Sequence, residues 1–138
     1  MLHQTTNDIT AIVSLADMEQ LTHVYFAKVD PCYGFVDERK IYSAVQQRWQ
    51  HSIVDASYDA VLAGVAALGC LFSSWADLGV EATLVSLVKS RLDLAAADGP
   101  SVDIAVAAVL RTVYLRMAGK LEEVRKTLVP GLLVSLTA

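Results

Sequence analysis

The sequence predicts an all-helical protein, a compact bundle of five to six helices. Apolar residues recur every three to four positions through several long segments, as they do on the buried face of a helix. Capping residues or glycine and proline separate these segments, and no segment alternates apolar and polar residues as a strand does. The 138 residues suit one domain with its own core, so we expect a single helical domain over residues 1–138.

Local signals place the first two helices. The first is expected over residues 14–29, since Ser14 and Asp17 have capping spacing and Pro31 disfavours helical geometry at the residue before it. The second is expected over residues 37–50, from a capping aspartate. Their apolar stripes are Met18, Leu21, Val24 and Tyr25, and Ile41, Ala44, Val45 and Trp49.

The third helix, over residues 57–74, is apolar on nearly all sides, which is typical of a helix at the centre of a bundle. Small residues on one side should let a neighbouring helix approach closely; they are Ala60, Gly64, Ala67 and Cys70. The run Ala60–Ala76 holds 17 uncharged residues, near the lower limit for a membrane span. Its alanine, glycine and serine content favours a buried helix instead.

Three further helices are expected, over residues 80–97, 102–118 and 120–128. The residues of the first of these that should face inward are Leu84, Leu87, Val88, Leu92 and Leu94. Residues 98–101 separate the first two of these, and Gly119 separates the last two. Pro130 should end the third, leaving residues 132–138 as an apolar tail.

Composition and charge narrow the possible functions. The apolar fraction is 54% and the charged fraction 19%, against roughly 45–50% and 25% in a typical soluble domain. Either an alanine-rich core or an exposed apolar face that meets a second copy or a partner explains this excess. The net charge of −4 and the scattered lysines and arginines argue against direct nucleic-acid binding.

Motifs for metal, cofactor or nucleotide binding are absent, so we expect no cofactor and no metal. Cys32 and Cys70 lie far apart in apolar surroundings and are expected to be reduced, buried thiols. The first ten residues lack the apolar core of a signal peptide. An intracellular location, in the nucleus or cytoplasm and without membrane contact, is therefore expected.

Four residues are candidates for catalysis if the chain is an enzyme: His23, Tyr33, Asp59 and Arg111. His23 adjoins the apolar stripe of the first helix and Tyr33 lies in an aromatic turn, where packing roles compete with chemistry. Asp59 follows Asp55 by four residues at the start of the third helix, where both carboxylates also stabilise the helix N-terminus. Arg111 lies between apolar neighbours and needs an acidic partner, from this chain or from a ligand.

Three segments resemble successive parts of the regulatory (middle homology) domain of fungal zinc-cluster transcription factors. Residues 25–37 resemble its aromatic entry, residues 59–73 its most recognisable helix, and residues 107–116 the helix that follows. With the helices that contain these segments, the resemblance covers residues 18–118. The six-cysteine zinc cluster of that family is absent, Asp30 replaces the usual histidine before the proline, and residues 119–138 form a divergent tail.

The resemblance implies a regulatory protein without DNA-binding activity of its own. It would act as a homodimer or with a related regulatory protein, and the tail and a second copy would cover its exposed helices. An alternative is a small helical enzyme of fungal secondary metabolism, a cyclase or isomerase, whose small-molecule ligand needs a pocket of roughly 300 Å³ or more. A third is a truncated reading frame that folds without a selected activity.

Overall fold

The computed structural model describes residues 8–30, 34, 36–51, 55–73, 78–95, 99 and 101–137. These residues form helices and no strand, which confirms the predicted all-α class. Six helices are present in them: α2 (Ile9–Ile12), α3 (Leu15–Lys28), α5 (Glu38–Gln50), α6 (Ala56–Leu71), α7 (Leu78–Ala95) and α8 (Val102–Thr137). None of the helices in these ranges is long and apolar enough to cross a lipid bilayer.

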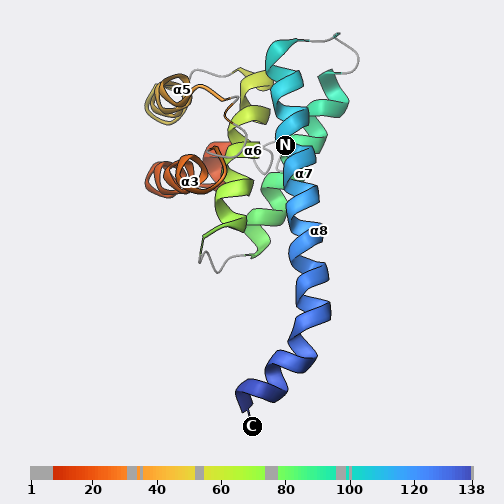
Figure 1. Cartoon of the computed structure of the whole chain (residues 1–138). Helices are drawn as coiled ribbons and strands as arrows, with labels where there is room; N and C mark the ends of the chain where they lie inside the picture. The colour runs from red at the N-terminus through yellow and green to blue at the C-terminus, as the bar shows by residue number, and fades with distance from the viewer. Residues whose placement is uncertain are drawn as a thin grey trace.

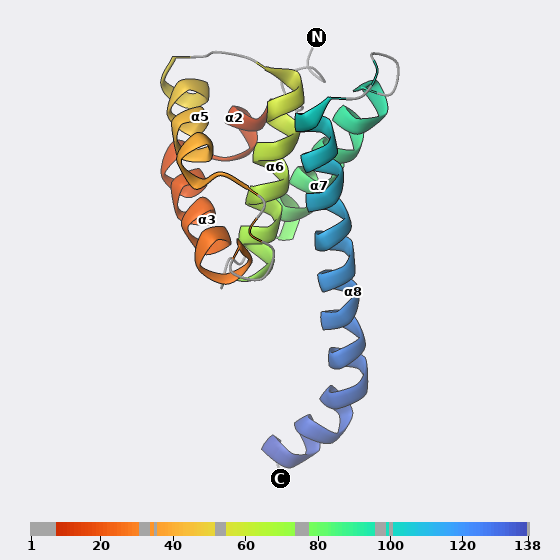
Figure 2. The same ribbon diagram turned by 45° about the horizontal axis from the view of Figure 1, so that its top comes forward.

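Helix α6 is the centre of the bundle. In Figures 1 and 2, α3 and α5 lie on one side of α6, and α7 and α8 lie on the other. Every residue of α6 from Asp59 to Cys70 is buried. The prediction of a buried central helix is confirmed, although α6 ends at Leu71 rather than Ser74.

Glycines of α6 let two neighbouring helices approach closely. A Cβ atom on Gly69 would lie 2.4 Å from the carbonyl oxygen of Leu21 in α3. One on Gly64 would lie 2.9 Å from the Cβ of Leu110 in α8. The close approach predicted from the small residues is confirmed at Gly64, and Gly69 adds a second contact that the sequence reading did not include.

Side-chain caps set the beginnings of the N-terminal helices. The Ser14 hydroxyl accepts a hydrogen bond from the Asp17 amide, and the Asp37 carboxylate caps α5, as predicted. The four-residue helix α2 was not expected. Its cap is Asp8, whose carboxylate accepts from the Thr10 amide at 3.0 Å, and its first residue packs into the core.

Helix α7 presents Leu84, Leu87 and Val88 to the core, as predicted. Leu94 was also expected to point inward, but it is 61% exposed. Leu84 and Val88 lie one turn apart on the buried face of α7. Leu94 lies in the last turn of the helix.

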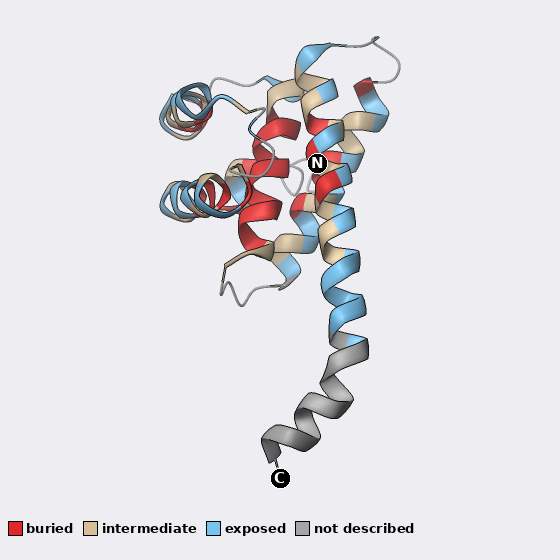
Figure 3. Ribbon diagram, in the orientation of Figure 1, coloured by how far each residue is buried: buried red, intermediate tan, exposed pale blue. Residues whose placement is uncertain are grey.

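The C-terminal part of the chain differs from the prediction. Helix α8 is continuous through Gly119 and Pro130, where two breaks had been expected. Gly119 costs only about 1 kcal/mol relative to alanine and is flanked by good helix formers, so helix propagation continues through it. Figure 1 shows α8 extending past the other helices, and Figure 3 shows mostly exposed residues in the part of α8 just before its grey end.

Candidate functional site

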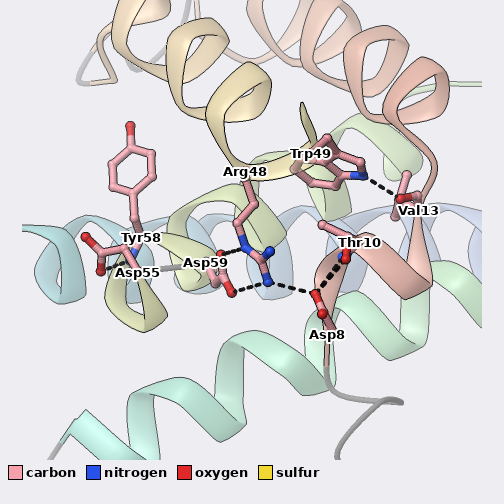
Figure 4. Close-up of polar contacts among 8 residues, drawn as sticks. All are labelled: Asp8, Thr10, Val13, Arg48, Trp49, Asp55, Tyr58 and Asp59. Carbon is pink, nitrogen blue, oxygen red and sulfur yellow. Dashed lines mark hydrogen bonds and ion pairs between the residues drawn. The ribbon is translucent and has the colours of Figure 1, made fainter. Parts of the chain in front are cut away.

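A buried arginine joins three helix ends. The Arg48 Nε donates to Asp59 Oδ1 at 3.0 Å, and Nη2 donates to Asp59 Oδ2 at 3.3 Å and to Asp8 Oδ1 at 2.7 Å (Figure 4). The exposed fractions of the side chains are 8% for Arg48, 2% for Asp59 and 42% for Asp8. This forked geometry is the strongest form of the arginine–carboxylate interaction.

The local sequence accounts for this meeting point. Arg48 lies in the last turn of α5, and Asp59 lies in the first turn of α6. Each charge therefore interacts favourably with the partial charge at that end of its own helix. Asp8 is the cap of α2. The indole N–H of the neighbouring Trp49 donates to the Val13 carbonyl at 2.9 Å, which ties α5 to the segment between α2 and α3.

The charges of Arg48, Asp59 and Asp8 stabilise one another. Burial lowers the pKa of the Arg48 guanidinium, but the hydrogen bonds and charges of Asp59 and Asp8 outweigh burial and raise that pKa. Burial likewise raises the pKa of the Asp8 carboxyl, but hydrogen bonds from Thr10 and the charge of Arg48 outweigh it and lower that pKa below 3.8. Arg48 and Asp8 are therefore both charged at neutral pH.

A cavity of about 320 Å³ opens beside this cluster, between α5, the start of α6 and the start of α8. Its lining residues are Lys40, Ser43, Ala44, Gln47, Arg48, Asp55, Tyr58, Asp59, Leu62 and Asp103. The Lys40 ammonium lies 3.9 Å from Asp103 Oδ1 and 5.2 Å from the centre of the Tyr58 ring. Burial raises the pKa of Tyr58 to about 12, with further contributions from the carboxylates of Asp103, Asp37 and Asp55.

Of the three candidates among the described residues, only Asp59 lines this cavity. Asp59 lines the cavity, where Arg48 already binds its carboxylate. His23 is exposed on α3, and Tyr33 lies outside the described residues. Arg111 is half-buried on α8, and its Nε makes no hydrogen bond to any described residue.

Both cysteines were expected to be buried thiols. Cys70 is buried and forms no disulfide with a described residue, as predicted, whereas Cys32 lies outside the described residues. Within the described ranges, no three histidine, cysteine or acidic side chains are grouped so that they could hold a metal ion.

Sequence reasoning missed Arg48, although a signal was present. Ile41, Val45 and Arg48 have the spacing i, i+4 and i+7, so the arginine extends the buried stripe of α5. A cation at such a position needs a buried carboxylate nearby. Asp59, at the start of an otherwise apolar helix, was the matching acidic residue.

Helix α8 carries a row of apolar side chains that is only partly buried. Leu110 and Val113 are buried, and Met117, Leu121 and Val124 continue their line at helical spacing. Leu121 is 39% and Val124 49% exposed. We call Met117, Leu121 and Val124 the α8 stripe; Met117 is half-buried against the core, and Leu121 and Val124 are exposed.

The chain is similar to parts of several fungal proteins. It is 42% identical over 110 residues to "Protein RDR1" of Gibberella zeae and 34% identical over 110 residues to "Transcription factor kojR" of Aspergillus oryzae. It is 30% identical over 113 residues to "Protein RDR1" of Saccharomyces cerevisiae. These matches cover 79–81% of this chain but only 20–21% of each relative.

The chain therefore spans about a fifth of the length of these relatives. The predicted resemblance is confirmed to that extent: most of the chain is related to a portion of larger fungal proteins, one of them named as a transcription factor. No family model and no solved structure matches the chain.

Proposed function

Because most of the chain is related to part of a fungal transcription factor, we propose that it is a regulatory protein of transcription that does not itself bind DNA. The similarity to kojR over 79% of the chain carries this proposal. The charge distribution supports it, since a net charge of −4 with scattered basic residues does not suit a phosphate backbone. Such a protein acts by association with another protein, and its place of action is the nucleus.

The partner that the α8 stripe suits is a second copy of this chain. Lys120 and Glu123 are both exposed, three residues apart and therefore on the same flank of the helix. When two α8 helices pack antiparallel through the stripe, Lys120 of each copy lies near Glu123 of the other. Packing of the stripe removes exposed apolar side chains from water, which favours association.

A double variant, Leu121→Glu with Val124→Glu, tests this contact. Both side chains are exposed, so the variant should remain folded while it places four carboxylates at the dimer contact. We expect light scattering across a micromolar dilution series to show dimer for the natural chain and monomer for the variant. Val102→Glu is the matched control, because Val102 is 78% exposed at the other end of α8. Self-association is contradicted if the natural chain is monomeric at every concentration. It is also contradicted if the chain pairs with a related factor but not with itself.

Deletion of the gene tests the regulatory function. We expect transcripts of neighbouring genes to fall and every product of their pathway to fall with them. Expression of the natural chain should restore the transcripts, whereas the double variant of the α8 stripe should not. Unchanged transcripts in the deletion strain refute the proposal.

The enzyme alternative has one supporting observation, the cavity of about 320 Å³, which meets the size that a small-molecule site requires. Of the four candidate catalytic residues, Asp59 lines it. An enzyme predicts that transcripts hold in the deletion strain while one intermediate accumulates. A reading frame without a selected activity predicts neither change.

A further inference from the structure

One side of α8 is apolar although it faces solvent. In Figures 1 and 2, α8 lies at the edge of the bundle and packs against α6 and α7. We call its exposed side the outer face; its residues are Ala105, Val109, Thr112, Leu115 and Arg116. Val109 is 46% and Leu115 47% exposed. A surface helix normally presents polar side chains to water, so this apolar face indicates a contact with another molecule.

This part of α8 is as apolar as a buried helix. Residues 104–118 are apolar except for Arg111, Thr112, Tyr114 and Arg116. The hydroxyl of Thr112 donates to the Ala108 carbonyl at 2.9 Å, so it needs no partner from outside. Helix α6 is also apolar on nearly all sides, and the helices around it bury it. In the part of the chain that the structure describes, the outer face of α8 has no such cover.

The outer face carries positive charge that the chain does not neutralise. Residues 104–121 contain three cations and no carboxylate. The cations are Arg111, Arg116 and Lys120, and none of them makes an ion pair with a described residue. Arg111 is half-buried, and its Nε makes no hydrogen bond to any described residue. A guanidinium that is partly removed from water needs an acidic partner, so the molecule that covers this face should be anionic.

We propose that the outer face of α8 binds an acidic amphipathic helix of another protein. Arg111 and Arg116 are five residues apart, hence about 140° apart around the helix, and they flank Leu115. Apolar side chains of the partner helix pack on Val109 and Leu115, and its carboxylates pair with the two arginines. The inference goes beyond the proposed function, because it names a partner other than a second copy of this chain.

An anionic membrane suits this face less well than a helix. The chain as a whole has a net charge of −4, and a membrane presents its charge to a wide surface of the protein. The carboxylates of the chain would therefore be repelled. A single helix meets only the cations of α8, because charges further away than about 8 Å are screened at physiological salt.

A second copy offers an acidic and apolar segment, residues 121–124, but the proposed dimer already uses it. There Leu121 and Val124 pack through the α8 stripe, and Lys120 of the other copy lies near Glu123. Thr112 lies five residues before Met117, so the outer face is about 140° around the helix from the stripe and remains open. This step rests on the proposed dimer, whereas the rest of the inference does not.

Binding of synthetic peptides tests the chemistry of the partner. The probe is a fluorescein-labelled peptide of about 15 residues, long enough to form a helix, with leucine and glutamate at helical spacing. Two control peptides carry glutamine or lysine in place of every glutamate. We expect fluorescence anisotropy to show that the acidic peptide binds at least about tenfold more tightly than either control, and more weakly as salt is added.

Two outcomes of this titration overturn the proposal. One is equal affinity for the three peptides, which would mean that charge does not select the partner. The other is no binding of the acidic peptide. If the chain then sediments with phosphatidylserine vesicles, the outer face is a membrane contact instead.

A double variant tests the location of the site. Leu115→Ser with Arg116→Gln changes two exposed residues and should weaken binding of the acidic peptide about tenfold, while circular dichroism stays helical. Leu94→Ser with Lys89→Gln is the matched control, because it makes the same changes on exposed residues of α7 and should leave the affinity within about twofold. Unchanged affinity in the α8 variant overturns the assignment.

Light scattering separates this inference from the proposed dimer. The Leu115→Ser, Arg116→Gln variant should have the same oligomeric state as the natural chain. If the variant is monomeric where the natural chain is dimeric, a second copy occupies the outer face and the proposal is wrong. If the natural chain is itself monomeric, the proposed dimer fails, and peptide binding still decides what the outer face binds.

Discussion

Replacing Arg48 by methionine should leave a buried carboxylate without its partner. Methionine keeps most of the apolar stem, so the change removes the guanidinium and its three hydrogen bonds but little of the packing. The Asp59 side chain is 2% exposed, so little of its carboxylate is accessible to water that could replace the lost hydrogen bonds. Asp8 is less affected, because 42% of its side chain is exposed.

The expected loss in the free energy of unfolding is about 3–5 kcal/mol at pH 7, the usual consequence of leaving one member of a buried ion pair alone. A small domain is typically stable by about 5–15 kcal/mol, so the variant should retain only part of its stability. This magnitude rests on the burial of Asp59 rather than on the number of bonds removed.

Urea unfolding followed by circular dichroism at 222 nm measures this loss. Arg39→Met is the matched control, because Arg39 is exposed in the first turn of the same helix and its loss should change stability by less than about 0.5 kcal/mol. If Arg48→Met costs less than about 1 kcal/mol, the carboxylate of Asp59 has found water or another partner. Burial of Asp59 would then not make its unpaired charge costly.

Three other predictions use the same unfolding measurement. Gly69→Ala should lower the free energy of unfolding by about 3 kcal/mol or more, because its Cβ would lie 2.4 Å from the backbone oxygen of Leu21. Gly119→Ala should raise it by about 1 kcal/mol, because no atom lies within 4 Å of the added Cβ and alanine favours the helix. The pKa of Tyr58 is raised to about 12 in the folded state, so its contribution is complete below pH 10 and is lost as pH rises through 12; Tyr58→Phe should remove that part of the alkaline loss. The pKa of Asp8 is lowered below 3.8, so its contribution is present above that pH and is lost on further acidification; Asp8→Asn should remove that part of the acid loss. Equal pH profiles for the variants and the natural chain, or a stable Gly69→Ala, would contradict these assignments.

Local signals predicted the parts of the fold that local interactions determine. The caps at Ser14 and Asp37 fixed where α3 and α5 begin, because each satisfies free amides in its own first turn. The all-round apolar pattern identified α6 as the central helix. Helix α2 escaped prediction because four residues are too few to show a period. The continuity of α8 at Gly119 was not predicted because a single glycine costs only about 1 kcal/mol, which cooperative propagation through the neighbouring helix formers offsets.

The candidate site was harder to predict, since its members come from separate elements. Asp59 was identified, but its partner Arg48 lies 11 residues away across a helix junction, and no local pattern specifies that pairing. Arg111, a cation among apolar neighbours, was expected to need an acidic partner, yet no described residue pairs with its Nε. Periodicity shows which face a charge occupies, but the partner depends on how the helices pack.

The buried pair of Arg48 and Asp59 is not required for stability as such. A buried ion pair replaced on both sides by apolar residues of similar volume is often as stable as the original or more so. The double variant Arg48→Met with Asp59→Leu should therefore recover most of the stability that Arg48→Met loses, as measured by urea unfolding. A double variant as stable as the natural chain shows that the cost of Arg48→Met comes from the unpaired carboxylate of Asp59. A double variant as unstable as Arg48→Met shows instead that the pair itself holds α5 and α6 together.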